Sequence, residues 1–397
     1  MADVEVIELL KKLVALPSVN PEHTDDASIA NEYRVADFFA GYLAERGFRI
    51  EWDRMTPERG SVLASYGPEQ PLHTLLLEAH LDTVGVADMV IPPFEPRVEN
   101  GRLYGRGSCD TKGPMAAAMT ALCPRVLDSL AEAGVRVLYI GAFGEEKGNV
   151  GAERLVESGV GAHSAIILEP TDLSIVYAHK GALWFEVLVT GEAAHGSDPD
   201  RGMNAIFAMA KVLQWLQTRT AQAQEEWNNP ALGGPTLNVG RIDGGIAMNI
   251  VAHRCRIEVD RRTVPGEDHE AILSEVRAML SDLQVDGEIR SFEVNVLKAG
   301  TPFQTAQDSV LVRGVQEVLV EGGCEPRLAT AAWYSDAGAF ARTCNEIIVF
   351  GPGSIHQAHT VDEYIEIDQL MKGEELLTRY FEWLSGHVHT FGAANSG

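Results

Sequence analysis

Histidine and acidic side chains occur at five places in the sequence where they could bind a metal ion. Four of these places follow a short apolar run, in the case of His359 after a loop, and the fifth is the glycine-rich segment GRGSCDTKG. In open α/β sheets, ligands bind at the carboxyl ends of the strands, so we expect these side chains to converge there. The residues concerned are His80, Asp82, Asp110, Glu145, Glu146, Glu169 and His359.

The residue types suit zinc or a similar divalent ion, which accepts imidazole and carboxylate ligands. Two histidines and three carboxylates are enough for two ions if one carboxylate bridges them. Ions held about 3.5–4 Å apart can share a water molecule, lower its pKa and stabilise an oxyanion. Glu145, beside Glu146, is a spare carboxylate that could accept the proton, and Asp82 could accept the second imidazole N–H of His80. The set therefore predicts a two-metal hydrolytic centre.

Each candidate also has an ordinary structural interpretation. His80 could be a hydrogen-bonded histidine at a strand end, and Asp110 could cap the helix that follows it. The Glu145–Glu146 pair could form a solvated turn, and Cys109 is better explained as a small buried thiol. Spacing alone leaves these interpretations open, whereas the coincidence of all five places at one sheet edge favours the metal centre.

The elements that must position these residues follow an alternating pattern. Apolar runs at residues 72–77, 136–140, 165–168 and 346–350 predict strands, and residues 114–127 and 308–320 have helical patterns. Strands that alternate with helices predict βαβ units and a mostly parallel sheet flanked by helices. We expect the tail at residues 386–397 to be frayed, so its two histidines are not candidate ligands.

The middle of the chain has a different pattern. The expected order is a strand at 183–190, a helix at 203–218, strands at 235–242 and 252–259, a helix at 269–283 and a strand at 289–296. This βαββαβ order is typical of a ferredoxin-like domain, here inserted in the larger one. With 397 residues, two domains are the natural expectation. We expect a catalytic domain of residues 1–180 and 298–397 and an inserted domain of residues 181–297.

Composition excludes several classes of function. A formal net charge of -25 argues against binding to nucleic acid or to an anionic membrane surface. We find neither a signal-peptide pattern nor an apolar run long enough to cross a bilayer. Five cysteines without a CxxC pair fit a reducing compartment, so we expect a cytoplasmic protein.

Six motifs together resemble the M20 family of metallopeptidases and deacylases. They occur in the family's order and span nearly the whole chain. The last motif is most similar to the acetylornithine deacetylase and succinyl-diaminopimelate desuccinylase branch. The motifs are EAHLDTV (78–84), GRGSCDTKGPMAA (105–117), GEEKGNVGA (144–152), ILEPT (167–171), AAHGSDPDRGMNAI (193–206) and GPGSIHQAHTVDEYI (351–365).

The resemblance implies a ligand set for two zinc ions, for which cobalt or manganese could substitute. His80, Asp110 and Glu169 would hold one ion. The same Asp110 would bridge to a second ion held by Glu146 and His359.

The resemblance also implies roles for residues beside the ligands. Glu145 would be the general base that activates the shared water, and Asp82 would orient His80. The bridging aspartate would precede a cis peptide bond, here between Asp110 and Thr111.

The last motif contains two histidines, of which one is the expected ligand. The family's ligand stands four residues before a glutamate, which selects His359 with Glu363. His356 would then line the site.

In the inserted domain, the resemblance implies residues that contact the substrate. His195 would reach the active site of a partner subunit and stabilise the oxyanion, which predicts a homodimer formed through this lid domain. Asn249 and Arg262 would bind the substrate carboxylate, because a guanidinium group matches a carboxylate in a bidentate way. Arg261 is an adjacent alternative, and an ordinary surface ion pair remains open for either arginine.

The implied activity is hydrolysis of the amide bond of an N-acyl amino acid by a water shared between two zinc ions. The alternative within the same class is a carboxypeptidase or dipeptidase acting on short peptides. Glutamate at position 169 favours deacylases and carboxypeptidase-like members over aminopeptidases. The intact ligand set argues against an inactive, substrate-binding relative. The chain has no GxGxxG that opens a helix after its first strand, no HExxH and no GxSxG, so dehydrogenase, single-zinc and serine mechanisms lack their usual motifs.

Overall fold

The computed structural model of the protein describes residues 2–393. Its chain divides into two compact units. Unit 1 comprises Met1–Tyr177, Gln304–Ala329 and Ser335–Gly397, and unit 2 comprises Ala178–Phe303 and Thr330–Tyr334. The short second segment of unit 2 was not expected from the sequence.

The main sheet contains nine strands within the described residues, in the order β1-β2-β6-β3-β7-β15-β8-β13, with β14 beside β8. Its four central strands, β6, β3, β7 and β15, are parallel, as the alternating pattern predicts. The nine strands are β1 (Arg49–Thr56), β2 (Arg59–Tyr66), β3 (His73–His80), β6 (Val135–Ala142), β7 (Ala162–Ile167), β8 (Ile175–His179), β13 (Phe303–Gln304), β14 (Leu328–Ala331) and β15 (Cys344–Val349).

The central strands are buried on both faces. Leu75, Leu76 and Leu77 of β3 are all fully buried, and so are Ile166 and Ile167 of β7. A continuous apolar run of this kind is what a parallel strand covered by helices requires, since both of its faces meet apolar side chains. The carboxyl ends of these strands therefore have fixed positions.

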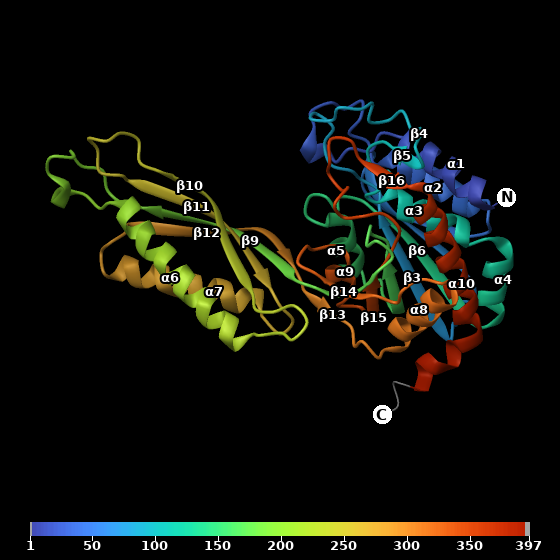
Figure 1. Ribbon diagram of the computed structural model, residues 1–397. Helices are drawn as coiled ribbons and strands as arrows, with labels where there is room; N and C mark the ends of the chain where they lie inside the picture. The colour runs from blue at the N-terminus through green and yellow to red at the C-terminus, as the bar shows by residue number, and fades with distance from the viewer. Residues whose placement is uncertain (1, 394–397) are drawn as a thin grey trace. The chain divides into compact units, whose positions relative to one another are not determined.

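Helices cover both faces of the main sheet. Helix α3 packs against α1 and α10, and α10 also contacts α4 and α8. Figure 1 shows α10 and α3 on one side of the sheet and α5 and α9 on the other. The helices of unit 1 are α1 (Ala2–Val14), α2 (Tyr33–Ala44), α3 (Lys112–Ala121), α4 (Pro124–Glu132), α5 (Val150–Glu157), α8 (Val310–Glu321), α9 (Ala337–Phe340) and α10 (Ile367–Ala393).

The expectation of a single helix at residues 114–127 was wrong. The chain forms α3 and α4 instead, and Cys123 between them has an extended backbone (φ -71°, ψ 159°). Pro124, the first residue of α4, is the cause, because proline has no N–H to donate and disfavours helical geometry in the residue before it.

The expectation of a frayed tail was also wrong for residues 386–393. Helix α10 continues to Ala393, and residues 394–397 lie outside the described part of the chain. Leu384, Val388 and Phe391 are buried, so the helix keeps an apolar face to its end.

A small antiparallel sheet joins two motifs that are far apart in sequence. Its strands are β4 (Arg97–Glu99), β5 (Arg102–Tyr104) and β16 (Tyr364–Glu366), and β5 pairs with both of the others. Tyr364 lies opposite Tyr104 in this pairing. The glycine-rich segment that follows β5 is thereby held against the residues that precede β16.

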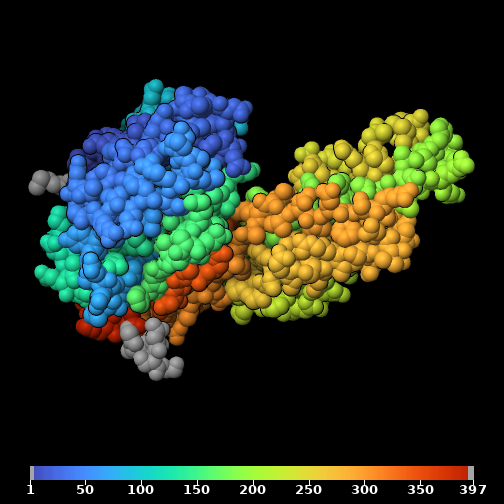
Figure 2. Space-filling view, turned by 180° about the vertical axis from the view of Figure 1, so that it is seen from behind, coloured from blue at the N-terminus to red at the C-terminus, as the bar shows by residue number. Residues whose placement is uncertain are grey.

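Strand β1, at the edge of the main sheet, forms an ion pair with α5. The guanidinium group of Arg154 donates two hydrogen bonds, of 2.9 and 2.7 Å, to the carboxylate of Asp53 in β1. In the space-filling view, the blue surface of the N-terminal strands borders the green surface of the segment that contains α5 (Figure 2).

Among residues 2–393, none of the helices has the length and apolar character that crossing a bilayer requires.

Unit 2 has the βαββαβ order that the sequence predicts. Its antiparallel sheet has the strand order β10-β11-β9-β12. Both helices cover the same face (Figure 1), where the core includes Phe185, Val187 and Ile257 from the sheet. The elements are β9 (Gly181–Thr190), α6 (Ala205–Glu226), β10 (Thr236–Gly244), β11 (Arg254–Thr263), α7 (His269–Val285) and β12 (Ser291–Gly300).

Candidate metal centre

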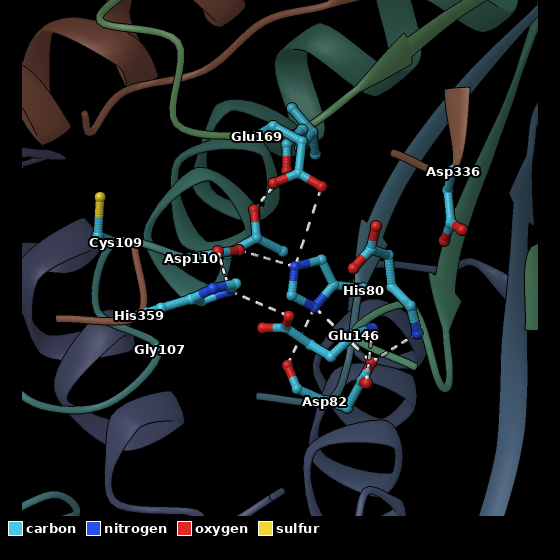
Figure 3. A network of polar contacts seen from close by, with 12 residues as sticks. His80, Asp82, Gly107, Cys109, Asp110, Glu146, Glu169, Asp336 and His359 are labelled. Carbon is cyan, nitrogen blue, oxygen red and sulfur yellow. Dashed lines mark hydrogen bonds and ion pairs between the residues drawn. The ribbon is translucent and has the colours of Figure 1, made fainter. Parts of the chain in front are cut away.

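The candidate ligands of unit 1 come together at the carboxyl ends of the parallel strands. His80 is the last residue of β3, Glu146 follows β6, and Glu169 follows β7. Asp110 lies in the loop before α3, and His359 lies in the loop after β15. Loops at this edge place the five side chains close together, as Figure 3 shows.

Asp110 is shared by two groups of ligand atoms. In the first group, His80 Nε2 lies 2.9 Å from Asp110 Oδ1 and 3.9 Å from Glu169 Oε1. In the second group, His359 Nε2 lies 3.4 Å from Asp110 Oδ2 and 3.0 Å from Glu146 Oε2. The candidate ligand atoms within each group lie within 4.8 Å of one another. Because each oxygen of Asp110 faces a different group, the aspartate has the arrangement of a bridging carboxylate.

The charges of the cluster favour bound cations. Burial, followed by the charge of Asp110, raises the pKa of Glu146 to about 7. Burial also raises the pKa of Glu169 well above its ordinary value. Glu146 Oε1 is buried and has no hydrogen-bond partner among the described residues. Buried carboxylates are costly unless they are paired or coordinate metal, so these side chains fit divalent ions.

The two histidines already take part in strong charge-assisted hydrogen bonds. Hydrogen bonds with the carboxylates of Asp110 and Glu146 raise the pKa of His359 to about 11. Burial alone would raise the pKa of Asp110, but the hydrogen bonds from His359 and His80 lower it below its ordinary value. Metal ligands bind in their deprotonated forms, so a bound ion would replace the protons that these groups share.

Glu363 holds the loop that carries Asp110. Its buried carboxylate accepts hydrogen bonds from the backbone N–H groups of Gly107 (3.0 Å), Cys109 (2.9 Å) and Asp110 (3.0 Å). It also accepts one from Arg106 Nη1 at 2.7 Å. Sequence reasoning used Glu363 only as a marker for His359 and missed this role, which a spacing of four residues does not reveal.

The peptide bond after Asp110 and the thiol before it agree with the sequence expectations. The peptide bond between Asp110 and Thr111 is cis, as the family resemblance implies. Cys109 is buried, and burial raises the pKa of its thiol well above the ordinary value, so it remains a neutral thiol. His356, which the resemblance implies would line the site, is exposed, and within the described residues no ion pair or hydrogen bond joins its side chain to the cluster.

The structure gives Asp82 a different set of partners from the one expected. His80 Nδ1 lies 3.0 Å from the backbone carbonyl of Asp82 and 3.7 Å from its carboxylate, so the carbonyl is the nearer acceptor. The carboxylate instead accepts hydrogen bonds from the backbone N–H groups of Glu145 (3.0 Å) and Glu146 (3.1 Å) and from Asn20 Nδ2 (2.8 Å). Asp82 thus holds the turn that carries the two glutamates.

Asn149 and Asp336 are neighbours of Glu145 that the sequence did not reveal. Asn149 Nδ2 lies 3.1 Å from Glu145 Oε1 and 2.8 Å from Asp336 Oδ1, and it can donate one hydrogen bond to each. Asn149 has a left-handed backbone (φ 55°), and both it and Asp336 are buried. The amide therefore orients the Glu145 carboxylate. The motif GEEKGN at residues 144–149 contains Asn149, but Asp336 comes from a distant segment. No local sequence pattern therefore links these two residues.

Two of the substrate-contact candidates are adjacent in unit 2. Gly196 N–H donates to the carbonyl of Asn249 at 2.7 Å, and the segment of His195 pairs with that of Ile250. Both His195 and Asn249 are exposed, and His195 Nδ1 lies 2.6 Å from Ser197 Oγ. The pairing brings these two side chains onto neighbouring loop segments at the surface of unit 2.

The two candidate arginines point to opposite faces of β11. Arg261 is buried on the helix side, where Nη2 lies 2.6 Å from Glu267 Oε1. Arg262 lies on the face that the helices leave uncovered and pairs with Asp260 (Nε–Oδ1 2.9 Å). Arg261 is therefore buried in the core of unit 2, whereas Arg262 is the more accessible of the two arginines.

The fold and the site together define a class of protein, namely a metal-dependent hydrolase with a carboxylate–histidine centre at the carboxyl edge of a parallel sheet. The sequence pattern of peptidase family M20/M25/M40 matches residues 76–383. The chain belongs to this family, and it is accordingly a metal-dependent hydrolase of amide bonds.

Curated relatives match over nearly the whole chain. The chain is 31% identical over 384 residues to an acetylornithine deacetylase of Edwardsiella ictaluri, covering 94% of this chain and 96% of the relative. It is 32% identical over 392 residues to one from Pectobacterium atrosepticum, covering 96% and 98%.

Solved structures share the fold at lower sequence identity. An M20 metallo-carboxypeptidase of Sulfolobus solfataricus superposes with a TM-score of 0.76 at 20% identity, covering 96% of this chain and 99% of that one. A dinuclear metal-binding M20 peptidase of Bacillus subtilis superposes with a TM-score of 0.70 at 15% identity, covering 98% and 99%.

Proposed function

We propose that the protein is a dinuclear zinc amidohydrolase that cleaves the amide bond of an N-acyl amino acid. The observation that carries the proposal is the position of Asp110, whose two oxygens face two separate groups of ligand atoms. The names of the curated relatives support a deacylase, and one structural neighbour is described as dinuclear metal binding.

The proposed ligand sets follow the two groups of side chains. His80, Asp110 and Glu169 would hold one ion, and Asp110, Glu146 and His359 would hold the other. Two divalent ions held there would supply Lewis acidity to the hydrolytic water and to the substrate carbonyl.

The proton transfers would be carried by Glu145. Asn149 donates to Glu145 Oε1 and so orients its carboxylate, while Asp82 fixes the backbone of the same turn. Glu145 would accept a proton from the attacking water and deliver it to the leaving amine nitrogen. A general base that also serves as acid needs this fixed orientation at both steps.

We propose that the substrate is recognised by residues of unit 2, which serves as a lid and dimerisation domain. Arg262 would bind the substrate carboxylate with Asn249, and His195 would donate to the developing oxyanion in the active site of a partner subunit. The domain boundaries expected from the sequence, 181–297 for the lid, belong to this proposal, as does a cytoplasmic location.

The test is hydrolysis of a panel of N-acetyl, N-formyl and N-succinyl amino acids and unmodified dipeptides. The enzyme is first stripped of metal and then supplied with zinc, cobalt or manganese. We expect no hydrolysis without metal, recovery with zinc or cobalt at two ions per chain, and faster cleavage of N-acyl amino acids than of dipeptides. Full activity in metal-free enzyme would overturn the metal centre, and a preference for dipeptides would show a peptidase instead.

A further inference from the structure

Two cationic side chains lie over one aromatic ring on the uncovered face of the sheet in unit 2. Trp184 lies on the central strand β9, opposite Lys298 of β12 and diagonally from Arg262 of β11. Lys298 Nζ lies 5.3 Å from the centroid of the Trp184 ring and 4.9 Å from that of Tyr334. Arg262 Cζ lies 5.9 Å from the Trp184 centroid. The two cations therefore flank the same indole from neighbouring strands.

Among the residues that the structure describes, Lys298 has no acidic partner, unlike other cations of the same face. Within residues 2–393, no carboxylate lies within ion-pair distance of its ammonium group. Arg256 on the same face lies 2.8 Å from Glu186, 3.5 Å from Asp243 and 3.3 Å from Glu258. In a chain with a net charge of -25, acidic residues are plentiful, so an unpaired lysine at this point is informative.

Two further donors at this place are incompletely used. The indole N–H of Trp184 is buried and donates to no acceptor among the described residues. Arg262 uses Nε and Nη2 for Asp260 (2.9 and 3.1 Å), which leaves Nη1 without a partner among the described residues. Buried donors are normally satisfied, so an unsatisfied indole N–H beside an unpaired ammonium group suggests an anionic ligand.

We propose that Lys298, with the indole N–H of Trp184, binds a second carboxylate of the substrate. This inference rests on the proposed function, in which Arg262 holds the first carboxylate. Contact with two aromatic rings holds the ammonium group in place and reduces its hydration, so less hydration energy is lost when a carboxylate binds. The preferred substrates are therefore N-acyl amino acids with an additional carboxylate, on the side chain or on the acyl group. A cationic side chain, as in N-acetyl-L-ornithine, would meet repulsion from Lys298.

The test uses substrate pairs that differ chiefly in this charge. N-acetyl-L-glutamate against N-acetyl-L-glutamine examines the side chain, and N-succinyl-L-norvaline against N-butanoyl-L-norvaline examines the acyl group. We expect kcat/KM to be about 10- to 100-fold higher for the charged member of one pair, the magnitude of a hydrogen bond to a charged group. The pair that shows the difference identifies the source of the carboxylate. Equal rates within both pairs would overturn the proposal.

Variants of Lys298 separate recognition from folding. Lys298→Met should reduce the charged-to-neutral ratio of that pair to near 1, and Lys298→Glu should shift the preference toward N-acetyl-L-ornithine. The control is Lys211→Met, since Lys211 lies on α6 and pairs with Glu288. This control should leave the ratio as in the wild type. A ratio that survives Lys298→Met would overturn the proposal.

Failure of the proposed function gives a different result. In that case none of the N-acylated compounds would be hydrolysed by the metal-loaded enzyme. Calorimetric binding of N-acetyl-L-glutamate, compared with N-acetyl-L-glutamine, then tests the carboxylate site independently. Tighter binding of the acid that Lys298→Met removes supports the site, and equal binding of both compounds contradicts it.

Discussion

The candidate residues of unit 1 and those of unit 2 differ in how they are held. Asp110 and Glu169 are buried. The carboxylate of Asp110 is hydrogen-bonded to His80, and its backbone N–H donates a hydrogen bond to Glu363. His195 and Asn249 are exposed on paired loop segments. Contacts within the protein fix the positions of the first set. The side chains of the second set are accessible to solvent and therefore to a ligand.

This difference indicates which property each set controls. Burial, and after it the charges of neighbouring carboxylates, raise the pKa values of Glu146 and Glu169, so the cluster in unit 1 requires opposite charge and hydrogen bonds. Changes to the candidate ligands themselves should alter metal content or folding stability as well as turnover. Exposed groups such as His195 contribute little to stability, so changes to the exposed candidates His195 and Asn249 should alter kinetics alone.

The largest expected effect is that of Glu145→Gln. The amide cannot accept the proton from water, so kcat should fall about 10²- to 10⁴-fold while both ions remain bound. Turnover and metal content per chain check this. The matched change Glu146→Gln should instead release one of the two ions. Near-normal turnover of Glu145→Gln would mean that another residue is the general base.

His195→Ala should lower kcat by about 10²- to 10³-fold, the effect of removing one donor to an oxyanion, with little change in thermal stability. The decisive measurement mixes His195→Ala with Glu145→Gln under conditions that exchange subunits. If the histidine acts in a partner's site, a mixed dimer has one intact site, and activity returns toward half of normal per mixed dimer. Proven exchange without recovery would place His195 in its own subunit's site or outside catalysis.

Two arginine–glutamate pairs allow the same comparison for stability. Arg106 and Glu363 are both buried, whereas Arg256 and Glu186 are partly exposed. Glu363→Gln removes the charge and leaves N–H donors of the Asp110 loop unsatisfied, so it should cost about 3–5 kcal/mol of unfolding free energy. Glu186→Gln should cost less than about 1 kcal/mol. Thermal unfolding of the two metal-loaded variants measures the contrast, and equal losses would contradict it.

The smallest expected catalytic effect is that of Asn149→Ala. It removes the hydrogen bond that orients Glu145, so kcat should fall about 10-fold, while KM and metal content stay unchanged. The control is Asn295→Ala in unit 2, where Asn295 Nδ2 lies 3.4 Å from Glu186 Oε1 on the outer face. A loss of metal or an equal effect of the control would show that Asn149 has only a structural role.

Much of the fold could be predicted from the sequence because it depends on local patterns. Apolar runs such as LLL at residues 75–77 predicted the central parallel strands, and the spacing of the middle segment predicted the βαββαβ order. Pro124 also marks the break between α3 and α4 in the sequence, although the helical pattern of residues 114–127 runs across it. Leu384, Val388 and Phe391 likewise marked the end of α10, but the small residues around them obscured the pattern.

The sequence by itself determined which side chains stand at the strand ends, because residue type and distance from an apolar run are local properties. Only the tertiary structure decided how these side chains are divided between the two groups of ligand atoms. It placed the two oxygens of Asp110 toward His80 and His359, which are 279 positions apart in the numbering of the chain. It also separated Arg261 from Arg262, because neighbouring residues of a strand point to opposite faces and only one face of β11 is covered by helices. Contacts between segments distant in sequence have no local pattern, so packing alone could decide them.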